Sequence, residues 1–209
     1  ADADTTRQYG FNLIEEDAKK GNGGSAMALG EFYLQGQYVK VDYEKAREWF
    51  AIAEAAGKPM AAYQLGVLYS NGLHYDSMPS VALHHFEKAA AGGVGAATRQ
   101  VAISYHTGIG VTKNLDDAMT CYTRSAEQGD ILAMRDLGNI YRFDRPNVGL
   151  AQNWLSKAAN LGDPDAHYIL GDMLRYSSPQ EARQHFLAAA KKKHHLSRVE
   201  VDPDYVPHE

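Results

Sequence analysis

The stretch Leu29–Gly57, with the sequence LGEFYLQGQYVKVDYEKAREWFAIAEAAG, decides the fold, because the rest of the chain repeats its pattern. It opens on a Leu-Gly pair with a tyrosine three residues after the glycine, turns at Gly36 and restarts at Asp42. Alanines and aromatic residues then recur at helical spacing until the stretch closes on Gly57. This combination of apolar spacing and turn residues predicts one helical hairpin.

Four further copies of the hairpin follow in the same register. A shift of 36 residues superposes the second and third copies on the first, and the last two copies have shorter internal turns. A single hairpin cannot bury its apolar face without a neighbour, so copies in register predict a solenoid. The recurring pairs are Leu29-Gly30, Leu65-Gly66, Val101-Ala102, Leu137-Gly138 and Leu170-Gly171.

Small residues are expected to set the distance between helices. An alanine recurs five residues before the central glycine, and at ~100° per residue it shares one helical stripe with the Leu-Gly pair and the tyrosine. The glycine is expected to let a partner backbone come close. The alanines are Ala61, Ala97, Ala133 and Ala166, and the tyrosines are Tyr33, Tyr69, Tyr105 and Tyr141.

Capping residues predict where the helices begin and end. Glycines at the ends of both helices suit a left-handed residue, and Ser178-Pro179-Gln180-Glu181 combines a cap, a first-turn proline and a capping-box glutamate. Predicted N-caps of second helices are Asp42, Asn114 and Asn147.

The repeated pattern resembles Sel1-like repeats, which are relatives of tetratricopeptide repeats with a longer period. The Leu-Gly pair, the tyrosine, the glycine turn and the Lys45-Ala46-x-x-Trp49 segment carry the resemblance. It implies an all-α fold, a right-handed α/α superhelix of about five helical hairpins with terminal capping helices. We expect an N-terminal segment and capping helix over 1–24, repeats over 25–57, 61–93, 97–129, 133–162 and 166–193, and a C-terminal tail over 194–209.

Composition restricts the function classes. The formal charge of -5 disfavours general nucleic-acid binding, and no apolar run approaches the ~20 residues that a transmembrane segment needs. The first residue is Ala1 rather than Met. If it follows a removed signal, the chain is periplasmic or otherwise exported, and if not, it is cytoplasmic.

Candidate chemical groups favour structural roles. Cys121 occupies the slot that Trp49 fills in the first copy, so we expect a buried structural thiol. His84-His85 and His194-His195 are adjacent pairs, and neighbouring helical residues diverge too far to share a metal ion. We therefore expect no metal, no cofactor and no catalytic residue.

The free face of the first helices is the candidate partner-binding surface. Positions three before and one, four and five after the central glycine point away from the core stripe. Tyrosine and arginine recur there, and both are enriched at binding hot spots. A locally basic groove with aromatic edges would suit an acidic loop or helix of a partner, whereas arginines paired with aspartates such as Asp136 and Asp172 would make an ordinary solvated face. The partner-binding candidates are Tyr63, Arg99, His106, Arg135, Asn139, Arg142, Tyr168, Asp172, Arg175 and Tyr176.

The resemblance implies a non-catalytic module that captures a protein partner in a concave groove. One concrete form is an immunity protein that neutralises a secreted antibacterial, phospholipase-type effector in the periplasm. Two alternatives stay open at this point. One is an adaptor or assembly scaffold of a bacterial envelope complex, and the other is a β-lactam-binding or hydrolysing relative.

Overall fold

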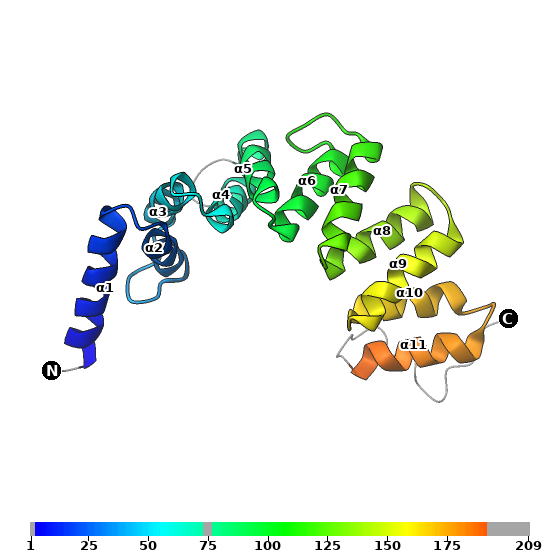
Figure 1. Cartoon of the computed structure of the whole chain (residues 1–209). Coiled ribbons are helices and arrows are strands. Elements are labelled where there is room, and N and C mark those ends of the chain that lie inside the picture. The colour runs from blue at the N-terminus through cyan, green and yellow to red at the C-terminus, as the bar shows by residue number, and fades with distance from the viewer. Residues whose placement is uncertain (1–2, 73–76, 192–209) are drawn as a thin grey trace. The chain divides into compact units, whose positions relative to one another are not determined.

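The computed structural model describes residues 3–72 and 77–191, and these residues form eleven helices and no strand (Figure 1). The predicted all-α fold is therefore confirmed. After α1 (Ala3–Lys19), the helices follow one another as five hairpins. These are α2 (Gly23–Gln35) with α3 (Tyr43–Ala55), α4 (Pro59–Asn71) with α5 (Pro79–Ala91), α6 (Gly95–Thr107) with α7 (Leu115–Glu127), α8 (Ile131–Phe143) with α9 (Val148–Asn160), and α10 (Pro164–Leu174) with α11 (Pro179–Lys191).

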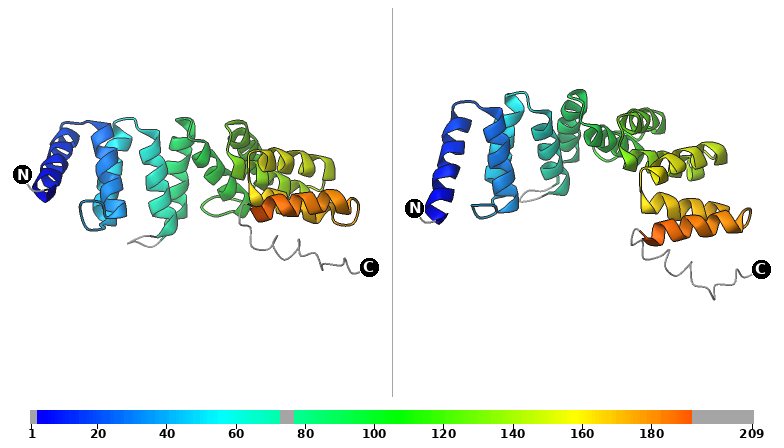
Figure 2. Two further views of the ribbon diagram at one scale, coloured as in Figure 1. Left: turned by 90° about the horizontal axis from the view of Figure 1, so that it is seen from below. Right: turned by 60° about the horizontal axis from the view of Figure 1, so that its bottom comes forward.

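The helices belong to two compact units, Ala1–Cys121 and Tyr122–Glu209, which we call unit 1 and unit 2. Within each unit the helices that pack most closely are neighbours in the chain. In unit 1 these run from α1 to α6, and in unit 2 from α8 to α11. Figure 2 shows α1 and α2 side by side at the start of unit 1. Packing between sequential neighbours is the contact pattern of a repeat array.

The helix α1 covers the first hairpin. It runs over Ala3–Lys19, within the predicted range 1–24, and packs against α2. Phe11 and Ala18 are buried in the core cluster of the first repeat, and Ile14 packs against it, whereas Leu13 is exposed. One stripe of α1 therefore supplies the apolar cover that an end repeat requires.

Alanines and aromatic rings fill the core of each hairpin. The alanine five residues before the central glycine is fully buried in every repeat after the first, as predicted. The central glycine, however, does not face a backbone. A Cβ atom on Gly66 would lie 2.5 Å from the ring of Phe86 on α5, and a Cβ atom on Gly138 would lie 2.5 Å from Leu155 on α9. The expectation of a close backbone was wrong, because a buried side chain of the second helix occupies that space.

Caps fix the helix ends. The side chains of Asp42, Asn114 and Asn147 accept backbone N–H bonds at the starts of α3, α7 and α9, so these predicted caps are confirmed. Asn22, Asp130 and Asp163 do the same for α2, α8 and α10, which the sequence analysis missed. Every second helix through α9 is followed by a glycine with positive φ, from Gly57 at 77° to Gly162 at 95°.

Part of the prediction falls outside the described residues. The end of the last predicted repeat, the His194-His195 pair and the tail 194–209 lie beyond Lys191, where the description ends.

Candidate protein-binding surface

The predicted face is divided between the two units. Three of its ten residues, Tyr63, Arg99 and His106, lie on α4 and α6 of unit 1 and are partly buried. The other seven lie in unit 2, on α8, on α10 or just after α10. In unit 2 members of the set contact one another, because both Arg142 and Arg175 pair with Asp172, and the candidate site therefore lies on α8 and α10.

Two of the three tyrosines of the set, Tyr63 and Tyr168, pack against core rings. The ring centroid of Tyr63 lies 5.8 Å from that of Phe86, and the centroid of Tyr168 lies 5.7 Å from that of Phe186. The ring planes in these pairs are inclined at 49° and 56°. These tyrosines therefore form rigid aromatic edges of their hairpins, with part of each ring committed to packing.

Arg135 is held between two aspartates at the start of α10. Its Nη1 atom donates to Asp163 Oδ2 at 3.1 Å and also pairs with the Asp165 carboxylate. The Asp163 side chain is only 4% exposed, and its Oδ1 atom accepts from the backbone N–H of Asp165 at 2.8 Å. Arg135 therefore ties α8 to the N-cap of α10, and its main role in the structure is to join two repeats.

The second cross-repeat ion pair lies near the other end of the same two helices. Arg142 Nη2 on α8 lies 3.2 Å from Asp172 Oδ2 on α10, and Arg175 Nη2 lies 3.8 Å from Asp172 Oδ1. The Asp172 side chain is 44% exposed, whereas the two arginines are 19% and 22% exposed. The pairing of arginines with Asp172 that the sequence suggested is therefore present in the structure.

Two exposed aromatic side chains lie at the same helix ends as the ion pair. The Arg142 guanidinium carbon lies 4.7 Å from the ring centroid of Phe143, and this ring is 70% exposed. Tyr176, directly after Arg175, is 81% exposed. We call Arg142, Phe143, Asp172, Arg175 and Tyr176 the end cluster, because they lie at the C-terminal ends of α8 and α10. The sequence analysis missed Phe143, although its place beside a predicted arginine at a helix end was a usable signal.

A histidine pair lies in the last hairpin, between α10 and α11. The Nδ1 atoms of His167 and His185 are 3.0 Å apart, which is hydrogen-bonding distance. Burial lowers the pKa of His167, and the neighbouring His185 lowers it further against the opposing effect of Asp163. Burial also lowers the pKa of His185, against the opposing effect of Glu181. The neutral forms are thereby favoured, and one imidazole N–H can donate to the other ring.

Other candidate groups take packing positions. Cys121 packs partly buried against the second core cluster, and His85 stacks on Tyr69 while its Nδ1 lies 2.8 Å from Glu54 Oε1. Over residues 3–72 and 77–191, no three His, Cys, Asp or Glu side chains are grouped to hold a metal ion. A search of the same residues finds no helix long and apolar enough to cross a membrane.

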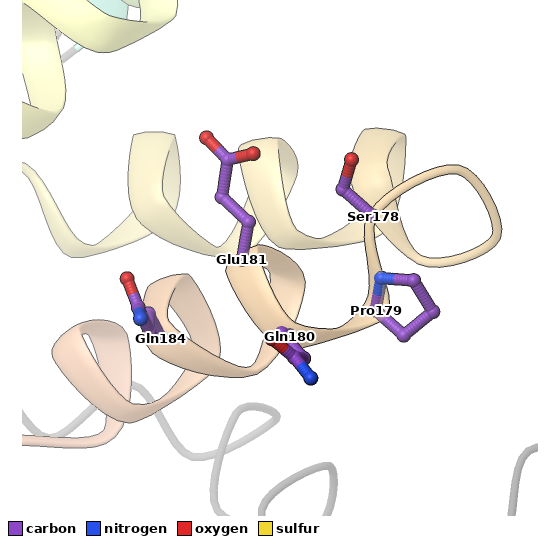
Figure 3. A pocket seen from close by; sticks show the side chains of 5 residues that line it. All are labelled: Ser178, Pro179, Gln180, Glu181 and Gln184. Carbon is purple, nitrogen blue, oxygen red and sulfur yellow. The ribbon is translucent and has the colours of Figure 1, made fainter.

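One pocket lies at the start of α11, and its lining begins at Ser178, shortly after Tyr176 of the end cluster. Its described lining consists of Ser178, Pro179, Gln180, Glu181 and Gln184. In Figure 3 the side chains of Ser178 and Glu181 point to one side of the helix, and Gln180 points to another. The described polar groups therefore do not converge on one point, as a catalytic constellation would.

Comparison with known proteins gives this geometry its context. A family model described as the Sel1 repeat matches residues 24–58, 59–94, 95–130, 131–163 and 164–194. An uncharacterized protein of Neisseria meningitidis serogroup B is 29% identical over 153 residues, which is 72% of this chain and 31% of that protein. The chain spans only part of the length of such curated relatives, from 9% to 31% in four of them.

Solved structures share the fold. A protective antigen present in uropathogenic Escherichia coli strains has a TM-score of 0.81 at 25% identity, over 91% of this chain and 43% of that chain. A Sel1 repeat protein from Oxalobacter formigenes has a TM-score of 0.79 at 27% identity, over 89% and 80% of the two chains. An immunity protein from Pseudomonas aeruginosa has a TM-score of 0.56 at 18% identity, over 93% and 75% of the chains. This last likeness is one of fold alone.

Proposed function

Because the chain belongs to the Sel1 repeat family, we propose that it is a non-catalytic module that binds a partner protein, with the first-helix surface of unit 2 as the contact. Repeat arrays of this kind offer long surfaces that are free of the core. In this chain the surface of α8 and α10 carries the side chains suited to binding. The proposed contact surface therefore lies on α8 and α10.

The observation that carries the proposal is the end cluster. Phe143 exposes 70% of its surface under Arg142, which Asp172 already holds, and Tyr176, next to Arg175 in the chain, exposes 81%. Tyrosine and arginine are the residues most enriched at binding hot spots, and burying an aromatic ring removes a large apolar area from water. An arginine held in place before binding also loses less conformational entropy when a partner arrives.

The more specific form of the proposal is an immunity protein. In this form the chain neutralises a secreted antibacterial effector of the phospholipase type in the periplasm. The likeness of fold to the Pseudomonas aeruginosa immunity protein supports the choice only by showing that a chain of this architecture can have that role. The partner in this form is a single toxic protein, and one-to-one binding is expected.

The general proposal is tested by co-purification with quantitative mass spectrometry. The bait is the full chain, compared with Arg142→Glu and with Arg183→Glu, a matched charge reversal at an exposed arginine on α11 of the same unit. We expect one protein to be recovered by the wild type and by the Arg183 variant, and to be depleted at least tenfold with the Arg142 variant. Equal recovery by all three baits would remove the proposed surface.

The immunity form has its own test. The co-purified protein is expressed in the periplasm of a bacterial host with and without this chain. We expect growth arrest without the chain and rescue with it, and a weaker rescue by Arg142→Glu. A partner that leaves growth unaffected, or several partners bound at once, would favour the assembly scaffold instead.

A further inference from the structure

The end cluster contains a carboxylate that occupies the place a ligand would take. Asp172 Oδ2 lies 3.2 Å from Arg142 Nη2, and the Asp172 side chain is 44% exposed. A surface ion pair of this kind contributes little to stability, about 0–1 kcal/mol. A carboxylate from outside can therefore exchange with Asp172 at small cost to the fold.

Arg142 is positioned before any ligand arrives. Asp172 holds its guanidinium from α10, and the ring of Phe143 lies under it with the guanidinium carbon 4.7 Å from the ring centroid. Its side chain is 19% exposed, so most of it is covered by the surrounding protein. A guanidinium recognises a carboxylate through its planar fork of N–H groups, which a fixed orientation favours.

Exposed aromatic surface lies at the ends of both helices that contribute to this ion pair. Phe143 at the end of α8 and Tyr176 after α10 are both more than two-thirds exposed. Rings at these positions gain little from the fold, so most of their area remains to be buried by another molecule. A partner that fits must therefore present a negative charge with an apolar side chain next to it.

We infer that the end cluster is a clamp for an acidic partner segment in which an Asp or Glu stands beside an aromatic or aliphatic residue, and that Asp172 competes with that segment for Arg142. This inference rests on the proposed function and names the chemistry of the partner at the same site. It gives Asp172 an unusual role, because a residue that contacts the binding arginine then weakens binding.

The two substitutions Arg142→Gln and Asp172→Asn separate the roles. Arg142→Gln removes the positive charge that recognises the carboxylate of the partner segment. Asp172→Asn keeps the size of the side chain and removes the competing charge, so it should strengthen binding. If Asp172 merely positioned Arg142, its neutralisation would weaken binding, and the sign of the effect therefore distinguishes the two accounts.

The probe is a library of random dodecapeptides displayed on phage and selected on the immobilised full chain. We expect enrichment of peptides that carry Asp or Glu within two residues of an aromatic or aliphatic residue. A synthetic peptide of the enriched sequence should bind Arg142→Gln at least tenfold more weakly and Asp172→Asn at least threefold more tightly. A control peptide with Gln in place of the acidic residue should bind the wild type and both variants with similar affinity. Circular dichroism of each variant checks the fold, and Arg142→Lys, which keeps the charge without the planar fork, serves if Arg142→Gln unfolds.

Several outcomes overturn the inference. These are enrichment of basic or uncharged peptides, absence of enrichment, unchanged affinity in Arg142→Gln, and weaker binding in Asp172→Asn. Enrichment that appears only after Glu200, Asp202 and Asp204 are neutralised would assign the surface to the chain's own C-terminal segment and would also overturn it. A protein partner that binds independently of Arg142 and Asp172 would leave the module function standing without the clamp. Peptide binding by the clamp without any protein partner would support the clamp and overturn the module function.

Discussion

The Nδ1 atoms of His167 and His185 lie 3.0 Å apart, and they join α10 to α11 in the last hairpin. At this distance one imidazole must donate and the other accept, so the contact requires that at most one of the two rings is protonated. Asp163, the N-cap of α10, opposes the lowering of the His167 pKa, and Glu181 on α11 opposes the lowering of the His185 pKa, but neither cancels it. The last hairpin therefore contains a histidine–histidine contact that depends on pH.

The stability of this hairpin should fall on acidification. Burial lowers the pKa of both histidines below the ordinary value of 6.5, so the unfolded hairpin binds more protons than the folded one as the pH falls below that value. Stability is then present above about pH 6.5 and is lost as the pH falls through the lowered pKa values. Hydrogen exchange of the α11 amides between pH 7.5 and pH 5 measures it. His185→Asn should flatten the dependence, and His84→Asn should leave it intact. An unchanged dependence in His185→Asn would contradict this origin.

Gly66→Ala should destabilise the second hairpin by about 1–3 kcal/mol, the usual cost of overpacking. The added Cβ would lie 2.5 Å from the ring of Phe86, a residue that is only 4% exposed. Gly10→Ala is the control, since nothing lies within 4 Å of a Cβ there. That change should stabilise α1 by about 0.5–1 kcal/mol. Urea unfolding of both variants provides the measurement, and equal effects of the two would refute the account of the glycine.

Asp163 has two separable roles in unit 2. Its side chain caps α10, and it pairs with Arg135, so Asp163→Ala should lower the free energy of unfolding by about 2–3 kcal/mol. Asp163→Asn keeps an oxygen for the cap and loses the charge, so its cost should be about half as large. Chemical denaturation compares the two variants. Identical losses would show that the cap contributes nothing beyond the ion pair.

The exposed aromatic residues should matter for binding and hardly at all for folding. Phe143→Ala and Tyr176→Ala should each reduce affinity for the co-purified partner by about tenfold or more, as loss of a hot-spot ring does. Their stabilities should stay within about 0.5 kcal/mol of the wild type, because both rings are mostly exposed. Leu187→Ala on α11, also exposed, is the matched control for affinity. Reduced stability without reduced affinity would contradict the assignment.

The sequence predicts the helices well because the same apolar spacing and the same turn and capping residues recur from repeat to repeat. The buried alanines, the glycine ends and the Asp42, Asn114 and Asn147 caps are local features, and their physical causes act within one or two turns of a helix. The role of the Leu-Gly glycine was predicted less well. Spacing alone shows that something comes close, but it does not show that the group is the Phe86 ring.

The contacts of the candidate site are harder to predict from the sequence, because they join different repeats. Arg135 pairs with Asp163 and Asp165, and Arg142 with Asp172, across α8 and α10. Which aspartate lies within reach depends on how two hairpins are packed and on the rotamers of long side chains, and neither follows from helical periodicity. Asp172 was predicted as a partner of the arginines, whereas Asp163 and Asp165 were not.

The most direct test of the central claim, that the ends of α8 and α10 contact a partner protein, is hydrogen exchange on the full chain alone and in complex with its co-purified partner. The account predicts strong protection on binding in the turns after α8 and α10, around residues 143–147 and 175–178, with little change at the opposite ends around Gly129 and Gly162. Protection confined to those opposite ends, or to the outer surfaces of α9 and α11, would contradict it.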